Sequence, residues 1–570
     1  MLPLRIRQFF YAICFNIFIG KVWTVKLTNF SSPQIGFKAA QVNIVAMSDN
    51  HGNVHNLPQL VGTIEQNKGD IFKKADEKST LNMFAIAGDF FMNPKKKGYM
   101  TKPELSNGDI QANFLNKVVN TVKNIVKNNF DTVYAPGNHC YDGGDEFLYG
   151  KLKDEPVKTL VTNVDLEKSP LVSGLMKDHP DIVTSKVYEV QDDKNPDLKH
   201  DVLFMGVTIP SLKGKLTKTE LYDNNNKKDT QITEKDLQKT FEVLNKQVQT
   251  FKEKHPKGAV VLLSHMGAPI SKMIENNVPN INVILNGHDH TRDNANDGKT
   301  MINSLGKDNE IIKSVNFKFN DDGDLEDVGF NMFVTENYAE NKDVKAFLDK
   351  NFEEDVKPLV KMKGASELEY SDKIRYANTE LTNFLTSSVM EEAQKEISDL
   401  SSVALQSSYV RGGIKEGSTN LNLLKIFDGI DVESQNLNVG TVKGSDMVEI
   451  ISKNVKSNLE APTRNTLIQW SDFQVNRSMI EDIQNGKSDK TYADAVKCRN
   501  QKTGEFEAID MNKDYKILLS NKILSKKDFA NVRENFTSIG KNYDDFFRAN
   551  LIGKNYEVDV NDKVKEQRVL

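Results

Sequence analysis

The chain has 570 residues, of which 38% are hydrophobic and 27% are charged. A chain of this length and composition is expected to fold into two or three globular domains, and the composition excludes a protein that is disordered throughout. The formal net charge of −5 gives no overall attraction to nucleic acid or to acidic membranes, so we expect no nucleic-acid partner.

The N-terminus has the order of a secretory signal. Arg5 and Arg7 precede the mostly apolar stretch FFYAICFNIFIG, which ends at Gly20 and is too short to span a bilayer. We therefore expect residues 1–25 to be a signal peptide, with an uncleaved N-terminal anchor as the alternative. The protein would then be secreted, periplasmic or held at the cell surface, and it would meet a membrane only if this segment is retained.

Short β-branched segments alternate with helical, lysine-rich ones from residue 42 to about residue 335. The expected strands are VNIVAMSD, NMFAIAGD, DTVYAPGNH, DVLFMGVTIP, AVVLLSHMG and INVILNGHDH. Helical patterns such as NFLNKVVNTVKNIVKNN and DLQKTFEVLNKQVQTFKEK lie between them. This alternation predicts a layered α/β domain over residues 40–337.

The rest of the chain is expected to form a linker and a second domain. Residues 338–372 are rich in Lys, Glu and Asp, which predicts a helical, solvated linker, and residues 373–570 read as a mixed α/β domain. The GKT at 298–300 lacks the upstream glycine of a P-loop, which excludes nucleotide binding of that kind. Cys140 and Cys498 would remain after removal of a signal peptide, and the sequence does not show whether they pair.

Potential metal ligands follow five of the six expected strands. In chain order these are Asp49, His51, Asp89, Asn138, His139, His265, His288 and His290. Six of the nine histidines of the chain fall in or beside these motifs. Because the carboxyl ends of strands in open α/β sheets meet at one crevice, we expect these side chains to converge on a single site.

The chemistry of this ligand set suits two divalent metal ions. Carboxylate, imidazole and amide ligands without a thiolate are typical of Zn, Mn, Fe or Co, and the sequence does not distinguish among them. A carboxylate that bridges two ions allows them to activate a water and to hold a phosphoryl group. Each histidine ligand would need its second ring nitrogen held by a carbonyl or a carboxylate.

The motif order D-x-H, G-D, G-N-H, S-H-x-G, G-H-x-H resembles that of the calcineurin-like metallophosphoesterases. Within them, GNHCYDGG is similar to the GNHEFDxG of the bacterial and animal 5′-nucleotidases, and TLVTNVD, VLFMGVTIPS and LIQWSDFQV also resemble segments of that family. The similarity extends over roughly residues 42–536. It implies a four-layer αββα sandwich that binds two metals, followed by a mixed α/β C-terminal domain that recognises the substrate.

The resemblance also assigns roles to the motif residues. It implies a first metal held by Asp49, His51 and His290, a second held by Asn138, His265 and His288, and Asp89 as the bridging ligand.

A histidine–aspartate dyad is implied beside the metals. His139 would donate a proton to the leaving oxygen or stabilise the phosphate, and Asp142 would orient it. The alternative for His139 is a structural histidine. The family has Glu where this chain has Cys140, which reads better as a small buried hydrophobic residue than as a reactive thiol.

The C-terminal half keeps fewer of the family's features. By resemblance to its recognition segments, Arg375, Asn383 and Arg411 are candidate substrate-binding residues, and Phe427 is a candidate for stacking on the base. Ile523 occupies the position of the family's second stacking aromatic. For Phe427, packing in the core is an equally good interpretation.

The resemblance thus implies a metal-dependent phosphohydrolase similar to 5′-nucleotidases, which would hydrolyse nucleoside 5′-monophosphates in nucleotide catabolism through a water activated by two metals. The alternatives are the same chemistry on UDP-sugars, cyclic nucleotides or another phosphoester, and a surface binding protein that no longer turns over. Retention of every metal and dyad position favours an enzyme, because a binding role needs none of them. The altered recognition segments favour the binding protein.

Overall fold

The computed structural model describes residues 40–72, 79–92, 109–192, 198–212, 214–225, 227, 229–296, 300–320, 322–352, 357–410, 412–424, 426–427, 436–461, 466–566 and 568. The expected signal segment, residues 1–25, and the candidate residue Arg411 lie outside them.

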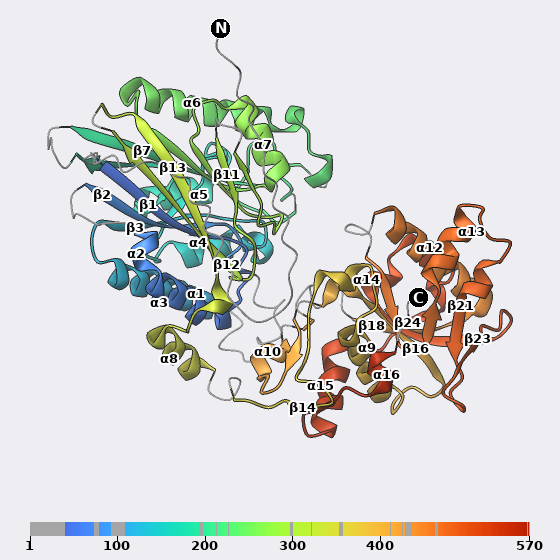
Figure 1. Cartoon of the computed structure of the whole chain (residues 1–570). Helices are drawn as coiled ribbons and strands as arrows, with labels where there is room; N and C mark the ends of the chain where they lie inside the picture. The colour runs from blue at the N-terminus through green and yellow to red at the C-terminus, as the bar shows by residue number, and fades with distance from the viewer. Residues whose placement is uncertain are drawn as a thin grey trace, which may run out of the picture.

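Two β-sheets stacked face to face form the centre of the N-terminal part (Figure 1). The larger sheet contains, in spatial order, β13 (Leu325–Val334), β12 (Ile311–Phe319), β1 (Ala40–Met47), β2 (Thr80–Ala87), β3 (Phe130–Ala135), β4 (Lys158–Leu160) and β5 (Ile182–Val183). The smaller sheet contains β10 (Asn294–Asn296), β11 (Met301–Ser304), β9 (Val283–Asn286), β8 (Ala259–His265), β7 (Lys199–Thr208) and β6 (Ser185–Gln191). All six strands expected from the sequence are present, within a few residues of their expected bounds.

Side chains of successive residues on these strands enter two different cores. Ile44 and Met83 pack between the two sheets, whereas their neighbours Val45 and Phe84 pack against the helices on the outer face. Strands β1, β2 and β8 are therefore buried along their whole length. This double burial is typical of parallel strands that are covered on both faces, and it explains their continuous apolar sequences.

Helices cover the outer face of each sheet. The larger sheet is covered by α1 (Leu57–Gln66) and α3 (Asp109–Val126), and the smaller one by α6 (Gln238–Lys254) and α7 (Ala268–Asn277) (Figure 1). The other helices of this part are α2 (Lys68–Ile71), α4 (Asp145–Leu152) and α5 (Pro170–Asp178). The αββα order predicted from the sequence is confirmed.

The carboxyl ends of the central strands lie at the same edge of the sandwich. Strands β1, β2 and β3 pair in parallel, and so do β7, β8 and β9. The two sheets contact each other through β2 and β8, among other pairs. The loops after β1, β2, β3, β8 and β9 are thereby brought to one place, as expected for ligand sites of α/β sheets.

The chain then leaves the sandwich through α8 (Lys342–Asn351) and two short strands, β14 (Lys361–Lys363) and β15 (Glu367–Leu368). Strand β14 pairs in parallel with β25 (Glu557–Asp559), close to the end of the chain. The segment 338–372, expected to be a helical linker, thus contains both helix and strand. The domain boundaries themselves stay predictions.

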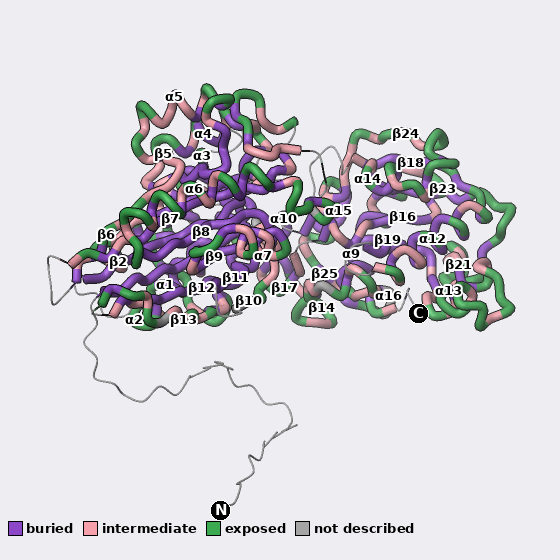
Figure 2. The backbone as a smooth tube through the Cα atoms, turned by 90° about the horizontal axis from the view of Figure 1, so that it is seen from above, coloured by how far each residue is buried: buried purple, intermediate pink, exposed green. Residues whose placement is uncertain are grey.

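A five-stranded sheet with helices on both faces forms the centre of the C-terminal part, which is mixed α/β as predicted. Its strands are, in spatial order, β19 (Ile468–Trp470), β16 (Leu400–Gln406), β23 (Asp514–Ser520), β18 (Leu437–Lys443) and β24 (Phe536–Ser538). Leu518 on β23 faces α9 (Glu380–Ala393) and α15 (Tyr543–Gly553), whereas Ile517 and Leu519 face α12 (Gly444–Glu460). Figure 2 shows this second buried centre beside that of the sandwich.

Smaller elements complete the C-terminal part. They are the pair β15 and β17 (Ile414–Lys415), the three-stranded sheet of β20 (Phe473–Val475), β21 (Val496–Arg499) and β22 (Phe506–Ala508), and the helices α10 (Asn420–Leu424), α13 (Arg477–Gln484), α14 (Asn521–Leu524) and α16 (Asp562–Lys565). None of the helices in the described ranges combines the length and the hydropathy needed to cross a bilayer.

Candidate dinuclear metal centre

The predicted metal ligands converge at the carboxyl edge of the sandwich. The candidate ligand atoms of five of them, together with one of His139, fall into overlapping groups, within each of which the atoms lie no more than 4.8 Å apart. One group contains Asp49, His51 and His290, and another contains Asp49, Asp89 and His265.

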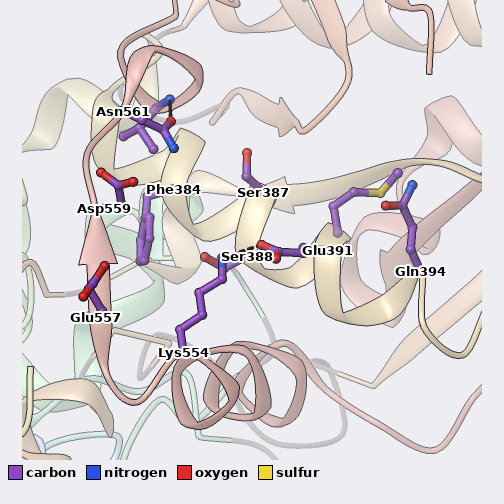
Figure 3. Close-up of a pocket in the computed structure, with 11 residues that line it drawn as sticks. Phe384, Ser387, Ser388, Glu391, Gln394, Lys554, Glu557, Asp559 and Asn561 are labelled. Carbon is purple, nitrogen blue, oxygen red and sulfur yellow. Dashed lines mark hydrogen bonds and ion pairs between the residues drawn. The ribbon is translucent and has the colours of Figure 1, made fainter. Parts of the chain in front are cut away.

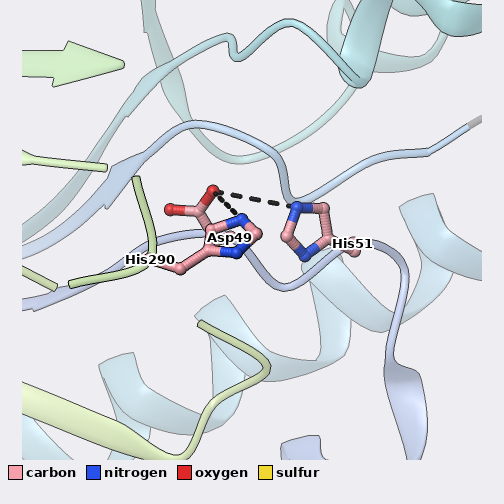
Figure 4. Close-up of side chains that lie close together, drawn as sticks. All are labelled: Asp49, His51 and His290. Carbon is pink, nitrogen blue, oxygen red and sulfur yellow. Dashed lines mark ion pairs between the residues drawn. The ribbon is translucent and has the colours of Figure 1, made fainter. Parts of the chain in front are cut away.

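The first group surrounds Asp49, which follows β1. The Nε2 atom of His290 lies 3.3 Å from Asp49 Oδ1, and the Nε2 atom of His51 lies 3.7 Å from the same oxygen. Figure 4 shows both imidazole rings directed toward this carboxylate. The three residues assigned to the first metal therefore present their ligand atoms to one point.

The second group surrounds Asp89, which follows β2. Its Oδ2 atom lies 3.0 Å from His265 Nε2 and 3.6 Å from His51 Nε2. The other two residues assigned to the second metal contact each other, because His288 Nδ1 lies 2.8 Å from Asn138 Oδ1. One oxygen of Asp89 thus lies beside a histidine assigned to each metal, which is the position that a bridging ligand needs.

The donor set fits two divalent metal ions. Asp49 Oδ1 and His265 Nε2 are buried and contact other members of the cluster as ion pairs, but neither makes a well-aligned hydrogen bond in the described part of the chain. Burial of such atoms costs free energy unless a partner satisfies them. Imidazole, carboxylate and amide ligands without a thiolate suit a transition metal or zinc, so the residues match the ions that the sequence predicts.

Charges within the cluster shift the pKa values of its members. Burial would raise the pKa of Asp49, but the neighbouring His265, His290 and His51 outweigh it and lower this pKa overall. Burial would lower the pKa of His265, yet Asp89 and Asp49 raise it to about 9. Each carboxylate is therefore held ionised, as a metal ligand must be, and a bound cation would take the place of the proton on His265.

A residue outside the predicted motifs supports His51. Burial lowers the pKa of His51 and Asp308 opposes this, with Asp308 Oδ1 3.8 Å from His51 Nδ1. The backbone N–H of Asp308 also donates a hydrogen bond of 2.8 Å to the carbonyl of Asp49. Asp308 lies in the loop before β12, where no ligand motif marks it in the sequence.

The second nitrogen of His265 lies 2.8 Å from the Ala87 carbonyl, as expected for a histidine ligand.

The backbone of the centre adopts an uncommon conformation. Five of the predicted ligands have a positive φ angle: Asp49 at 53°, His51 at 52°, Asp89 at 48°, His288 at 89° and His290 at 60°.

Two glycines of the motifs permit the close approach of these segments. A Cβ atom on Gly137 would lie 2.2 Å from Asp89 Oδ1, and one on Gly287 would lie 2.0 Å from Ser48 Oγ. Any larger residue at either position would displace a ligand segment.

His139 and Asp142 form the predicted pair beside the metal ligands. His139 Nδ1 lies 2.8 Å from Asp142 Oδ2, and the side chain of His139 is 38% exposed whereas that of Asp142 is 1% exposed. Burial raises the pKa of Asp142, but His139 and Lys215 bring it down to about 2. The backbone N–H of His139 donates to Asp89 Oδ1 over 2.8 Å, which connects the pair to the carboxylate predicted to bridge the metals.

Cys140 is a buried structural residue. Its Sγ atom lies 2.9 Å from the hydroxyl of Tyr134, and burial raises its pKa to about 12. A thiol with this pKa is not a nucleophile at neutral pH. Cys140 and Cys498 are both free, so the two do not pair.

The candidate substrate residues belong to the C-terminal part. Asn383 is buried and donates to the carbonyls of Val564 and Glu566 over 2.9 and 2.6 Å, and Arg375 is half-buried. Phe427 is only 3% exposed, and its ring stacks on Tyr543 with the centroids 5.9 Å apart. Core packing describes the position of Phe427 in this structure, while substrate roles for these residues stay predictions. Ile523 and the nearby Phe529 are also buried, in the core that faces α12.

A separate cavity of about 470 Å³ lies beside α9 in the C-terminal part. Phe384 and Glu391 line it from α9, and Lys554 and Glu557 line it from the segment between α15 and the end of β25 (Figure 3). None of the predicted site residues is among its lining residues.

Comparisons with known proteins agree with this site. Residues 42–292 match the family model of the calcineurin-like phosphoesterases. No curated protein sequence matches the chain. Residues 42–292 therefore form a calcineurin-like phosphoesterase domain, and by class the protein is a phosphoric ester hydrolase that uses divalent metal ions.

Solved structures with the same fold include nucleotidases. A 5′-nucleotidase precursor from Thermus thermophilus has 15% identity and a TM-score of 0.60, and the match covers 93% of this chain and 99% of that one. A putative 5′-nucleotidase from Staphylococcus aureus has 14% identity and a TM-score of 0.51, with 91% and 98% covered. The sulfate thiohydrolase SoxB from Thermus thermophilus has 15% identity and a TM-score of 0.57, with 95% and 97% covered. The chain thus has the two-domain fold of the 5′-nucleotidases.

Proposed function

We propose that this protein hydrolyses nucleoside 5′-monophosphates to nucleosides and phosphate. The observation that supports this most directly is the contact of Asp89 with both parts of the site. Its Oδ2 atom lies among the histidine ligands, while its Oδ1 atom accepts a hydrogen bond from the backbone of His139. The metal ligands and the candidate proton donor are therefore held in one arrangement, which a binding protein would not need.

Two divalent ions held by the two ligand groups would supply a nucleophilic water at neutral pH and would neutralise the oxygens of the phosphoryl group. The protein's own contribution begins with the fixed positions of Asp49 and Asp89, whose carboxylates are buried and ionised. The amide of Asn138 would bind the phosphate side of the substrate.

His139 would complete the reaction from the exposed side of the site. Its Nδ1 atom is held by Asp142, so its Nε2 atom is free to carry the proton that the leaving 5′ oxygen needs. The buried carboxylate of Asp142 also holds the orientation of this ring. Proton transfer of this kind contributes typically about 10²–10⁴-fold to a rate.

The substrate class is tested by phosphate release from metal-stripped protein to which Zn, Mn, Co or Mg is added back. The panel contains nucleoside 5′-monophosphates, UDP-sugars, cyclic nucleotides and an aryl phosphate. We expect a chelator to abolish activity, a transition metal to restore it, and the nucleoside 5′-monophosphates to be the best substrates.

Two other outcomes define the alternatives. Preference for UDP-sugars, cyclic nucleotides or another phosphoester would mean that the protein carries out the proposed hydrolysis on a substrate other than a nucleoside 5′-monophosphate. This alternative is supported by the replacement of the family's second stacking aromatic by Ile523 and by the sulfate thiohydrolase with the same fold. Nucleotide binding without any phosphate release would identify a binding protein that has lost turnover.

We also propose that the protein acts outside the cytoplasm. The basic and then apolar order of residues 1–25 supports this location. N-terminal sequencing of protein recovered from the culture medium and from membranes distinguishes a cleaved signal from a retained anchor.

A further inference from the structure

Lys215 reaches the histidine–aspartate pair from a different part of the chain. Its Nζ atom lies 2.6 Å from Asp142 Oδ1 and donates a hydrogen bond of 3.1 Å to the backbone carbonyl of Asn138. The other oxygen of Asp142, Oδ2, is the one that contacts His139 Nδ1. Asp142 therefore has a different partner on each oxygen.

The burial of Asp142 gives this ion pair its importance. A carboxylate that is 1% exposed needs a compensating charge, and removal of one partner from a buried pair is costly. The Lys215 ammonium group places a positive charge at Oδ1, the oxygen of Asp142 that His139 does not contact. By binding Oδ1, Lys215 fixes the plane of the carboxylate, and that plane fixes the orientation of the His139 ring.

The loop that carries Lys215 is itself attached to the segment after the pair. The Thr217 hydroxyl donates to Asp145 Oδ1 over 2.8 Å, and the Lys218 backbone N–H donates to Asp145 Oδ2 over 2.7 Å. Asp145 is the first residue of α4, three residues beyond Asp142. The position of the Lys215 side chain is therefore determined by the fold.

We propose that Lys215 is a positioning residue that holds the Asp142–His139 pair in the orientation needed to protonate the leaving oxygen. This proposal rests on the function proposed above. Lys215 acts through Asp142 and is assigned no contact with the metals or with the reacting phosphorus.

The test compares Lys215→Met, Lys215→Arg and the matched control Lys218→Met. Lys218 lies in the same loop and forms an ion pair with Glu146 on the surface. For each variant, metal content, melting temperature, kcat and KM are measured on phosphate monoesters whose leaving groups range from a nucleoside to 2,4-dinitrophenol.

A good leaving group departs without a proton. The loss of kcat in Lys215→Met must therefore depend on the leaving group. For Lys215→Met we expect kcat to fall by about 10–100-fold on nucleoside monophosphates, within the range of general acid catalysis, and only a few-fold on the dinitrophenyl ester. Metal content and KM should stay close to those of the wild type. Lys215→Arg should recover most of the loss, and Lys218→Met should match the wild type.

An equal loss on every leaving group, a loss of metal, or an equal effect of Lys218→Met would overturn the assignment of Lys215. A Lys215→Met variant as active as the wild type would also overturn the assignment of Lys215, but it would not affect the proposed function. A wild type that hydrolyses aryl phosphates but no nucleotide overturns the proposed substrate, and the aryl series then decides the role of Lys215 alone.

Discussion

Asp89 is buried between the ligands assigned to the two metals, and this position makes it the most sensitive single residue of the site. Asp89→Ala would remove an oxygen from both metals and the acceptor for the His139 backbone. Loss of an outer-shell partner typically costs about 10–100-fold in metal affinity or activity, so loss of a shared ligand should cost at least ~10²-fold in turnover.

Elemental analysis and phosphate release measure both effects of this substitution. Asp70→Ala, at an exposed position on helix α2, is the control. Retention of two metal ions by Asp89→Ala at wild-type affinity would contradict a bridging role.

His139 is close to the metals in space but is assigned a different task from its neighbours. His139→Ala should keep its metal content and lose turnover by about 10²–10⁴-fold, because only the proton donor is removed. Asp142→Asn should have the same effect in a milder form. The control is His255→Ala, since His255 forms a comparable pair with Asp201 over 2.7 Å outside the centre. Loss of a metal from His139→Ala would show that the residue is a ligand.

At the scale of elements, the turn between α4 and β4 contains a carboxyl group whose pKa is shifted by its surroundings. Burial raises the pKa of Glu155 to about 7, against the opposing effect of a hydrogen bond with Asn116. The pKa in the folded protein is above that in the unfolded chain. Glu155 therefore stabilises the fold fully below pH 4.5, and this contribution is lost as the pH rises through 7.

Glu155→Gln should accordingly have a higher free energy of unfolding than the wild type at pH 8, by about 1–2 kcal/mol after allowance for partial exposure. At pH 4.5 the two proteins should differ little in stability. Denaturant unfolding at the two pH values measures this difference. Glu253→Gln, on the exposed face of α6, is the control for removal of one carboxyl group. A variant less stable than the wild type at pH 8 would mean that ionised Glu155 has a favourable partner.

The sequence predicted some strands of the sandwich and not others, and the difference has a physical reason. Strands β1, β2 and β8 are buried on both faces, so their continuous apolar runs and the ligand motifs after them were visible in the sequence. The antiparallel pair β12 and β13 was not predicted, because residues such as Lys313 and Asn316 interrupt the apolar pattern of β12. The supporting residues Asp308 and Lys215 were also missed. Their contacts join loops that are distant in the chain, and no local pattern encodes such a contact.

At the scale of the whole molecule, the catalytic sandwich and the C-terminal part have separate cores. Phe427 belongs to the second core, where it contacts Tyr543 and Phe547. Phe427→Ala should therefore destabilise the protein by about 3–5 kcal/mol, the usual cost of removing a buried aromatic ring. Hydrolysis of nucleotides and of aryl phosphates by the folded variant should change by the same factor.

Calorimetry and steady-state kinetics on both substrates measure these effects. Phe506→Ala, at a half-buried position on β22, is the control for removal of an aromatic ring. A variant of unchanged stability that binds nucleotides weakly would contradict core packing and would support a role for Phe427 at the base.

The left-handed backbone of the ligand segments has a consequence for how the site can be lost. His51, His288 and His290 each adopt a conformation that costs an ordinary residue about 1–2 kcal/mol and costs glycine almost nothing. A change from histidine to glycine at any of them would therefore relax the chain while it removed a ligand. That relief is opposed by the loss of positive charge beside the buried carboxylates, so each strained histidine is a local cost that the fold carries for the sake of its metal site.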